Sequence, residues 1–535
     1  MLISLEIPLR ILIADPIHEI GIEFLQQQND IEVIVPSERL TNNTLLNFIS
    51  DVEGVIIRSE SQINEEVILA AKKLRVIGRA GVGIDNINIT SATSNGIAVV
   101  NAPTGNIIAA AEHTIAMMLA SARHIPKADA SLKDQLWNRS QFMGIQILNK
   151  TLGIIGLGRV GTEVARMALG LKMKVIGCDP FVTEERANRI GVELVEFEQL
   201  LPKSDFLTIH TPLTDPSQYL IGKDEIEKLK PGATIINVAR GGLVDENALI
   251  RALDENKLAS AAIDVFKEEP PEDYTLAKHP KVIATPHLGA STNEAQSDVA
   301  IEVAEQVLAV LRGQPASNTL NAPFSSREGD EDIAPYMQVA ATIGKIAIQL
   351  ASGQIRSIGI EYTGNIASYN TDGIKAAALV GLLQHVTNSR VSLVNALLLA
   401  DQRGLDIVET HNSSTTEYVN LLTIRINTDN GSVVLAGSNV RGNTHILRVN
   451  DYHFDTTIDS PHLLFVENID RPGVIGGIGA IAGKADINIS FMVLGRLAPR
   501  GHAMMILGID EFIPSTAREE LEKFPGITNV RAVSL

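Results

Sequence analysis

Three polar side chains in the middle of the chain offer the groups that hydride chemistry needs. His287 can give or take a proton near neutral pH, because histidine is the side chain whose charge changes in that range. Glu269 can hold the far ring nitrogen of such a histidine and favour the imidazolium. Arg240 can grip a carboxylate through two parallel hydrogen bonds and polarise an adjacent carbonyl. Each of the three follows an apolar, strand-like run.

A glycine-rich turn at residues 156–161 lies between an apolar run and a helix-like run, and a second apolar run ends on Asp179. Gly156 permits a tight turn, Gly158 lets the backbone approach a pyrophosphate, and Gly161 lets helix and strand pack closely. The amides at the start of the helix favour phosphates. Asp179 is expected to accept hydrogen bonds from both ribose hydroxyls and to repel a 2′-phosphate. The pattern predicts NAD as the cofactor, rather than NADP.

Composition and charge limit the class of protein. The chain has 535 residues, 45% hydrophobic and 20% charged, which fits a globular protein of three or four domains. A net charge of −18 argues against a nucleic acid or an anionic membrane surface as partner. The single cysteine, Cys178, excludes an internal disulfide. The first residues show no basic run or cleavage site, and no apolar run is long enough to span a bilayer, so we expect a cytoplasmic protein. No metal site is predicted.

The elements that must position these groups alternate between strand and helix over residues 10–292. Such alternation predicts an α/β fold with parallel sheets covered on both faces. Long helices are predicted near residues 106–123 and 293–312. The predicted strands are residues 11–14, 31–35, 55–57, 75–77, 97–100, 151–155, 174–178, 206–210, 234–238, 260–264 and 282–284.

The pattern changes after residue 320. Residues 320–455 mix helices with longer β-like runs at 418–426 and 432–436, which predicts an α+β domain. Residues 460–535 read as strand, helix, strand, strand, helix, strand, the ferredoxin-like βαββαβ arrangement. The predicted strands there are 462–467, 487–494, 502–509 and 527–533, and the predicted helices are 473–485 and 515–524.

Several long segments resemble the D-isomer-specific 2-hydroxyacid dehydrogenases and occur in that family's order. They are residues 78–87, 156–161, 237–242, 264–270 and 285–292. The resemblance implies two Rossmann/flavodoxin-like domains. It assigns a substrate-binding domain to residues 1–103 plus 293–319, and an NAD-binding domain to residues 104–292. Residues 320–455 resemble the family's intervening, substrate-binding-like domain, and residues 460–535 resemble a regulatory ACT domain.

The same resemblance assigns roles to the polar residues. It implies that His287 takes the hydroxyl proton, that Glu269 supports it, and that Arg240 binds the substrate carboxylate and carbonyl. The cofactor contacts carried over, beyond the glycines and Asp179, are Arg159, Val160, Thr211, Val238, Asp264, His287, Gly289 and Ala290.

Among the family's reactions, the resemblance is to NAD-dependent oxidation of 3-phospho-D-glycerate to 3-phosphohydroxypyruvate, the first step of L-serine biosynthesis. A phosphate needs cations in a chain of negative charge, and Arg58 and Arg79 each follow a predicted strand of the first domain. The backbone around Val82 and Gly83 can cradle a carboxylate. Further substrate contacts are predicted at Asn106, at the domain crossing, and at Arg139. Arg139 lies in residues 137–144, which resemble a dimer arm that reaches the partner's site; lysine is frequent in relatives where Asn138 stands.

The C-terminal region resembles ACT domains, which pair edge to edge and bind amino acids at the interface. The resemblance implies L-serine as effector, held by Asn468, Asp470 and Asn488. A purely architectural pairing module is the alternative. Two pairing surfaces favour a homo-oligomer, and the choice between dimer and tetramer stays open.

Two other functions remain open at this stage. One is a D-2-hydroxyacid dehydrogenase of the glycerate or lactate type. The other is a non-catalytic sensor of NAD or amino acids on the same fold, against which His287, Glu269 and Arg240 argue, since a sensor needs no proton relay.

Overall fold

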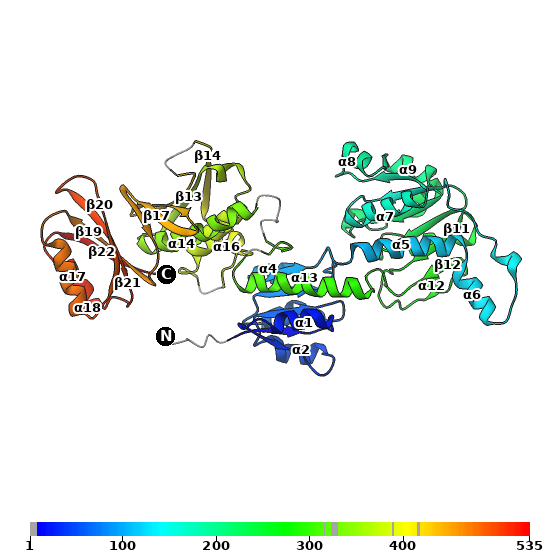
Figure 1. Cartoon of the computed structure of the whole chain (residues 1–535), viewed down its shortest axis with the longest axis horizontal. Coiled ribbons are helices and arrows are strands. Elements are labelled where there is room, and N and C mark those ends of the chain that lie inside the picture. Colours follow the sequence, from blue (N-terminus) through cyan, green and yellow to red (C-terminus); the bar gives the residue numbers. More distant parts are fainter. Residues whose placement is uncertain (1–7, 315, 323–329, 388–389, 415–417) are drawn as a thin grey trace.

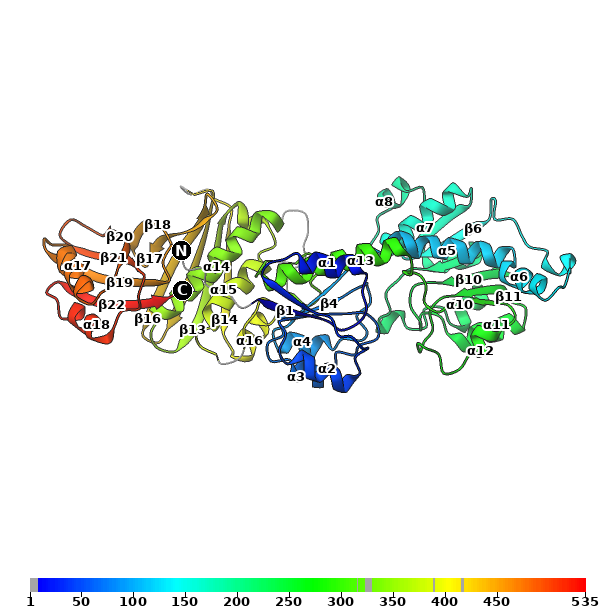
Figure 2. The same cartoon turned by 60° about the horizontal axis from the view of Figure 1, so that its bottom comes forward.

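The computed structural model describes residues 8–314, 316–322, 330–387, 390–414 and 418–535. Four sheets lie in a row along an elongated molecule (Figures 1 and 2). The first sheet of the sequence lies in the middle of that row, between the second sheet on one side and the third and fourth on the other. Most of the N-terminal stretch that carries the cytoplasmic prediction, residues 1–7, lies outside the described residues. No helix of the described ranges has the length and apolar character needed to cross a membrane.

The first sheet is parallel, in the order β2-β1-β3-β4-β5. Its strands are β1 Leu9–Ile13, β2 Ile31–Ile34, β3 Gly54–Ile57, β4 Val76–Arg79 and β5 Ala98–Asn101. Its helices are α1 Glu19–Gln26, α2 Asn42–Ile49, α3 Glu65–Ala70 and α4 Ile89–Ser94, and α13 Asn293–Leu311 returns from later in the chain to cover one face. A Cβ on Gly78 would lie 2.5 Å from Val307, so glycine allows α13 to approach the sheet closely.

The second sheet is also parallel, in the order β12-β11-β10-β9-β6-β7-β8. Its strands are β6 Thr151–Ile155, β7 Lys174–Cys178, β8 Glu193–Leu194, β9 Phe206–Ile209, β10 Ala233–Asn237, β11 Leu258–Ile263 and β12 Val282–Ala284. Its helices are α5 Ile107–Ala122, α7 Arg159–Gly170, α8 Glu184–Arg189, α9 Phe197–Lys203, α10 Lys223–Lys228, α11 Glu246–Asp254 and α12 Thr275–Lys278. The strand order reverses between β6 and β9, and such switch points bind ligands at the carboxyl ends of the strands.

The two parallel sheets are joined at two crossings of the chain. One leads into α5 and the other into α13. The amides of Thr104 and Gly105 each donate to Glu302 Oε2 on α13, both at 3.1 Å, and a Cβ on Gly105 would lie 2.7 Å from the Val299 nitrogen. The two crossings are therefore held against each other.

The third sheet is mixed, in the order β14-β13-β15-β16-β17-β18. Its strands are β13 Ile355–Gly364, β14 Asp406–Asn412, β15 Asn420–Thr428, β16 Gly431–Val440, β17 Asn443–Val449 and β18 Tyr452–Thr457. Its helices are α14 Asp330–Leu350, α15 Asp372–Leu383 and α16 Ala396–Gln402. The β-like runs predicted at 418–426 and 432–436 are β15 and β16, and the other strands were not predicted.

The fourth sheet has the predicted βαββαβ order. Its elements are β19 His462–Ile469, α17 Val474–Lys484, β20 Ile489–Arg496, β21 His502–Ile509, α18 Ser515–Glu522 and β22 Ile527–Ser534, and its strand order is β20-β21-β19-β22. One face carries α17 and α18. The other packs onto α14, so that Leu463 and Ile506 share one core with Ile343. The Gln349 side chain also donates to and accepts from the backbone of Ser534, both at 3.0 Å. The predicted fold class is confirmed, and the last two sheets form one packed unit.

Candidate active site

The glycine turn at the end of β6 gives its three glycines three different environments. Gly156 has φ +90°, a backbone conformation that L side chains rarely adopt. A Cβ on Gly158 would meet no atom within 4 Å, so its backbone is open to a close approach. A Cβ on Gly161 would lie 2.0 Å from the Gly156 carbonyl oxygen, so this glycine is needed for packing. These are the separate requirements of a turn that faces a pyrophosphate.

The side chains beside this turn fit a dinucleotide. Asp179, half-buried at the end of β7, accepts hydrogen bonds from the amides of Leu157 and Phe181, both at 2.8 Å, and each carboxylate oxygen keeps a further acceptor position. The Thr211 hydroxyl is buried and has no hydrogen-bond partner within the described ranges. It lies next to the turn, because a Cβ on Gly156 would be 3.0 Å from Thr211 Cγ2. A buried hydroxyl without a partner is costly and suits a polar ligand. Arg159 and Val160 open α7 at the same turn.

Three loops at the carboxyl ends of β10, β11 and β12 carry Arg240, Glu269 and His287, and each loop touches the next. A Cβ on Gly241 would lie 1.8 Å from the Phe266 carbonyl oxygen, so the first two loops are in close contact. The Phe266 amide donates to Glu269 Oε1 at 3.0 Å. Glu269 Oε2 lies 2.6 Å from Nδ1 of His287. The structure therefore brings the three predicted side chains to one edge of the sheet through a continuous series of contacts.

The charge of Glu269 determines which ring nitrogen of His287 is available for proton transfer. Burial raises the pKa of Glu269, but the hydrogen bonds from His287 and from the Phe266 amide together lower it by a larger amount. The resulting pKa lies below the ordinary value. The carboxylate is therefore ionised at neutral pH and accepts a hydrogen bond from Nδ1–H of His287. His287 Nε2 is left to exchange a proton, and the side chain is 48% exposed, which lets a substrate reach it.

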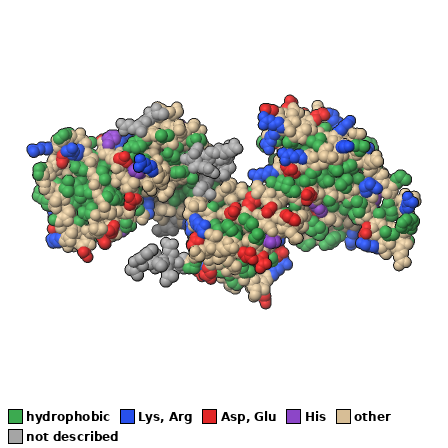
Figure 3. Space-filling view, in the orientation of Figure 1, with side chains coloured by type: hydrophobic (Ala, Val, Ile, Leu, Met, Phe, Trp, Pro, Cys, Tyr) green, Lys and Arg blue, Asp and Glu red, His purple; other side chains and the backbone are tan. Residues whose placement is uncertain are grey.

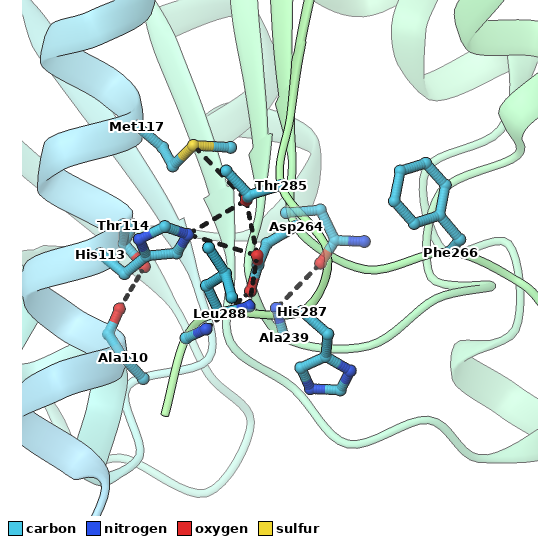
Figure 4. A network of polar contacts seen from close by, with 12 residues as sticks. Ala110, His113, Thr114, Met117, Ala239, Asp264, Phe266, Thr285, His287 and Leu288 are labelled. Carbon is cyan, nitrogen blue, oxygen red and sulfur yellow. Dashed lines mark hydrogen bonds and ion pairs between the residues drawn. The ribbon is translucent and has the colours of Figure 1, made fainter. Parts of the chain in front are cut away.

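Asp264, which directly follows β11, organises the loop that carries His287. Its side chain is fully buried and accepts hydrogen bonds from the Thr285 hydroxyl at 2.6 Å and from the amides of Leu288 and Gly289 at 2.8 and 2.9 Å. Burial raises the pKa of Asp264, and hydrogen bonds led by the one from His113 lower it more, so the group is a carboxylate. Figure 4 shows these contacts, with α5 at the left.

The neighbouring predicted cofactor positions lie beside this carboxylate. A Cβ on Gly289 would lie 3.1 Å from Val238 Cγ1 and 3.3 Å from Asp264 Oδ2, so Val238 and the 289 backbone face each other. The Ala290 carbonyl accepts a hydrogen bond from the Gln296 side chain at 2.8 Å, which ties the loop to α13.

Three arginines lie near one another where the first sheet meets the second. Arg58 and Arg79 are at the ends of the neighbouring strands β3 and β4, and Arg240 reaches the loop after β4. Burial is the main cause that lowers the pKa of Arg79 to about 10, and the charges of Arg240 and Arg58 lower it further, while Asp85 opposes them. Nε of Arg79 is buried without a partner in the described part of the chain. Arg240 Nε lies 4.0 Å from Asp85 Oδ2. Such crowding of like charges marks a site for an anion.

Backbone around the cluster completes this side of the site. A Cβ on Gly83 would lie 2.7 Å from an Arg240 guanidinium nitrogen, so the loop after β4 reaches the second domain's arginine. Val82 is 37% exposed, and its carbonyl is fixed by a hydrogen bond from the Asn101 side chain at 2.8 Å. The Arg58 amide is held at 2.6 Å by the buried carboxylate of Asp15. Asn106 lies at the domain crossing, where it precedes α5.

Two groups of predicted contacts do not join this site within one chain. Arg139 is exposed and lies in the short helix η1 Arg139–Phe142, after α6 Ile125–Lys133. Figure 1 places α6 at the end of the molecule beyond the second sheet, away from the first. It can reach such a site only in another chain.

The predicted effector residues are also separated. β19 and β20 both run antiparallel to β21, so they run parallel to each other. Asn468 and Asp470 therefore lie at one end of the sheet and Asn488 at the other. Asn488 instead donates to Asp510 at 2.6 Å, and Asp470 accepts from the Arg496 side chain at 3.2 Å. A set that includes all three needs two chains.

Sequence reasoning missed Asp85 and His113. Asp85 lies within a segment that was recognised as a whole, but its approach to Arg240 is a tertiary contact. His113 had a signal, since it interrupts an alanine- and methionine-rich helix one turn before the buried Met117.

Comparisons with known proteins agree with this geometry. Residues 115–289 match the model for the D-isomer specific 2-hydroxyacid dehydrogenase NAD binding domain, and residues 332–450 match that for the D-3-phosphoglycerate dehydrogenase intervening domain. D-3-phosphoglycerate dehydrogenase of Methanocaldococcus jannaschii is 42% identical, over 98% of this chain and 100% of its own. The enzyme of that name from Bacillus subtilis is 39% identical, over 98% of this chain and 99% of its own.

Solved structures match more than half of the chain. The TT0316 protein of Thermus thermophilus gives a TM-score of 0.54 at 30% identity and covers 58% of this chain and 100% of its own. The apo structure of D-lactate dehydrogenase from Escherichia coli gives a TM-score of 0.53 at 27% identity and covers 58% of this chain and 100% of its own. The NAD cofactor predicted from the glycine turn is thus confirmed by the matched NAD-binding domain, and the chain belongs to the D-3-phosphoglycerate dehydrogenases, within the D-isomer-specific 2-hydroxyacid dehydrogenase family.

Proposed function

We propose that this NAD-dependent dehydrogenase oxidises 3-phospho-D-glycerate to 3-phosphohydroxypyruvate, the first step of L-serine biosynthesis. The observation that carries the proposal is the crowding of Arg58, Arg79 and Arg240 next to the loops that hold the His287–Glu269 pair. A substrate with both a carboxylate and a phosphate offers enough negative charge to offset three guanidinium groups, whereas glycerate and lactate carry a single carboxylate. The names of the full-length relatives support the same substrate.

The roles of the polar side chains follow from their positions. Arg240 binds the substrate carboxylate and the oxygen on carbon 2. His287 Nε2 accepts the hydroxyl proton, and the carboxylate of Glu269 stabilises the imidazolium that results. NAD, when bound, supplies the acceptor for the hydride that leaves carbon 2. Arg58, Arg79 and the amides near Val82 and Gly83 hold the two anionic ends, and Asn106 contributes from the domain crossing.

The residues proposed to hold NAD surround the glycine turn and the two loops that follow β10 and β12. The group comprises Gly156, Gly158, Arg159, Val160, Gly161, Asp179, Thr211, Val238, Asp264, His287, Gly289 and Ala290. The open backbone at Gly158 and the buried, unpartnered hydroxyl of Thr211 support this assignment.

The test is steady-state NADH formation with 3-phospho-D-glycerate, D-glycerate and D-lactate. We expect kcat/KM to be highest for the phosphorylated substrate. Arg58→Ala removes one charge-assisted contact of about 1.5–3 kcal/mol and should lower that value about 10–100-fold, with little change on glycerate. Arg312→Ala, which breaks an exposed pair with Asp30 at 2.7 Å, is the control and should leave kcat/KM unchanged for both 3-phospho-D-glycerate and D-glycerate. Equal losses on all substrates would refute the phosphate assignment, and a wild-type chain inactive on all three would favour a sensor.

We also propose that the chain forms a homo-oligomer through the arm that follows α5. This segment and α5 before it expose large apolar side chains, and Figure 3 shows hydrophobic side chains gathered over α5 on one face. They include Ile108, Ile125, Leu132, Leu136, Trp137, Met143 and Ile145, with Trp137 76% and Met143 80% exposed. Such patches are typical of interfaces. Pairing here would also carry Arg139 to the partner's site. Light scattering on Trp137→Asp, expected to give a smaller species, tests the interface; an unchanged mass would exclude it.

L-serine is the effector we propose for the fourth sheet. Asn468 is 2% exposed and its Oδ1 has no hydrogen-bond partner among the described residues, which suits an ammonium or hydroxyl donor. Edge-to-edge pairing of two chains would bring Asn488 of the partner subunit to Asn468 and Asp470. Calorimetry with L-serine should show binding that Asn468→Ala abolishes; binding unaffected by that change would place the site elsewhere.

A further inference from the structure

The long helix α5 contributes a histidine to the support of the His287 loop. The His113 side chain is only 20% exposed, and its Nε2 lies 3.1 Å from the Thr285 hydroxyl and 3.3 Å from Asp264 Oδ1. Figure 4 shows this ring pointing from α5 toward Asp264, while the imidazole of His287 points away from the network. His113 therefore does not reach the reacting atoms and can act only through its neighbours.

The hydrogen bonds around His113 assign its proton. The carboxylate of Asp264 can only accept, because its pKa lies below the ordinary value. The Thr285 hydroxyl lies 2.6 Å from that carboxylate and 3.8 Å from Met117 Sδ. The charged oxygen at the shorter distance is the stronger acceptor, so it takes the single proton of the hydroxyl in its hydrogen bond. The Thr285 oxygen can then only accept from the histidine. The network thus assigns a proton to Nε2 of His113, shared between Thr285 and Asp264.

Three consecutive backbone amides of the His287 loop depend on the same aspartate. Its carboxylate accepts from the amides of Leu288 and Gly289, and its carbonyl accepts from the amide of His287 at 2.9 Å. His287 itself has φ +54°, a conformation that non-glycine residues hold only when their surroundings enforce it. The orientation of the Asp264 carboxylate therefore fixes the position of the His287 backbone.

We propose that His113 is a positioning residue for His287. Its Nε2–H and the Thr285 hydroxyl hold the buried Asp264 carboxylate in the rotamer that accepts the Leu288 and Gly289 amides, and this keeps the imidazole of His287 against Glu269. The proposal rests on the proposed function, because it acts through the proton transfer at His287. Small displacements of a reacting group cost up to about 100-fold in rate, so the effect should appear in kcat.

The test compares three variants. His113→Leu removes the donor, and His113→Gln keeps an N–H near the position of Nε2. Thr114→Val, next in the helix, removes a buried hydrogen bond to the Ala110 carbonyl at 2.8 Å that has no link to Asp264. We expect His113→Leu to lower kcat about 10–100-fold with KM for 3-phospho-D-glycerate changed less than about twofold, and His113→Gln to restore most of kcat. Thr114→Val should lose stability but keep kcat.

Hydrogen exchange gives a readout that does not depend on activity. In His113→Leu, a peptide covering Leu288 and Gly289 should exchange at least about fivefold faster than in the wild type, with His113→Gln and Thr114→Val close to wild type. The proposal would be overturned if His113→Leu left both kcat and the exchange rate unchanged. It would also be overturned if Thr114→Val lowered kcat and raised the exchange rate as much as His113→Leu does. If the wild type oxidises none of the 2-hydroxy acids, the proposed function fails, and the exchange rates alone decide the positioning role.

Discussion

Arg79 is expected to be a residue whose removal stabilises the free protein and weakens its substrate binding. Burial, with the charges of Arg240 and Arg58, lowers its pKa from the ordinary arginine value to about 10, and at about 1.36 kcal/mol per pKa unit this fall corresponds to about 3 kcal/mol against the charged form. At any pH below about 10 the group is charged in both the folded and the unfolded chain, so the folded state carries this cost throughout the neutral range. Arg79→Met keeps an unbranched apolar stem and removes the charge. We expect it to raise the free energy of unfolding by about 1–3 kcal/mol.

The assay pairs thermal unfolding with kinetics. The gain corresponds to a Tm increase of a few degrees, roughly 3–8 °C. In the same variant kcat/KM for 3-phospho-D-glycerate should fall about 100-fold, because charge-assisted contacts to the phosphate are lost. Arg312→Met, which breaks the exposed pair with Asp30, is the matched control. It should change neither the free energy of unfolding nor the activation free energy obtained from kcat/KM by more than about 0.5 kcal/mol. A lower Tm together with an unchanged kcat/KM would refute the reasoning and make Arg79 a structural residue.

Two further predictions separate folding from binding. The Cβ of Gly158→Ala would meet no atom within 4 Å, so the Tm of this variant should match or slightly exceed that of the wild type, while NAD binds at least about tenfold more weakly. The Cβ of Gly161→Ala would lie 2.0 Å from the Gly156 carbonyl oxygen, so this variant should lose about 2–4 kcal/mol of the free energy of unfolding. Calorimetry measures NAD binding, and thermal unfolding measures stability. If Gly158→Ala binds NAD normally, the backbone there does not face the pyrophosphate. Glu269→Gln should lower Tm at pH 7, and the gap to the wild type should narrow as the pH falls below 4.5, because the folded pKa of Glu269 is lowered and its stabilising contribution is lost on protonation. A gap that persists at low pH would show that the ionised carboxylate is not its source.

The parallel α/β half of the fold was predictable because its strands are short apolar runs with clear turn signals. The strands predicted at 151–155, 174–178 and 282–284 are β6, β7 and β12 as observed, and the other predicted strands shift by one or two residues at their ends. The third sheet was harder to predict. β14 lies at the sheet edge and β17 is rich in polar residues, so neither shows the apolar run that identifies a buried strand. The shared core between α14 and the last sheet depends on tertiary packing, which periodicity does not encode.

The candidate site shows the same division. Arg240, Glu269 and His287 were identified from residue type and segment order, and the glycine turn from its spacing. The contacts that position these residues could not be predicted from the sequence, because Phe266, Asp85 and His113 act through tertiary contacts. The separation of Asn488 from Asn468 follows from strand direction in the fourth sheet, which the element order alone left open.

The most direct test of the central claim is the turnover of His287→Ala. The structure gives this imidazole an ionised partner at 2.6 Å on Nδ1 and a second nitrogen with no partner among the described residues, which is the arrangement of an acid–base group. We predict that kcat with 3-phospho-D-glycerate falls about 10²–10⁴-fold, while calorimetry still shows NAD binding through the other residues of its site. Near-normal turnover with intact NAD binding would remove His287 from the reaction and contradict the account.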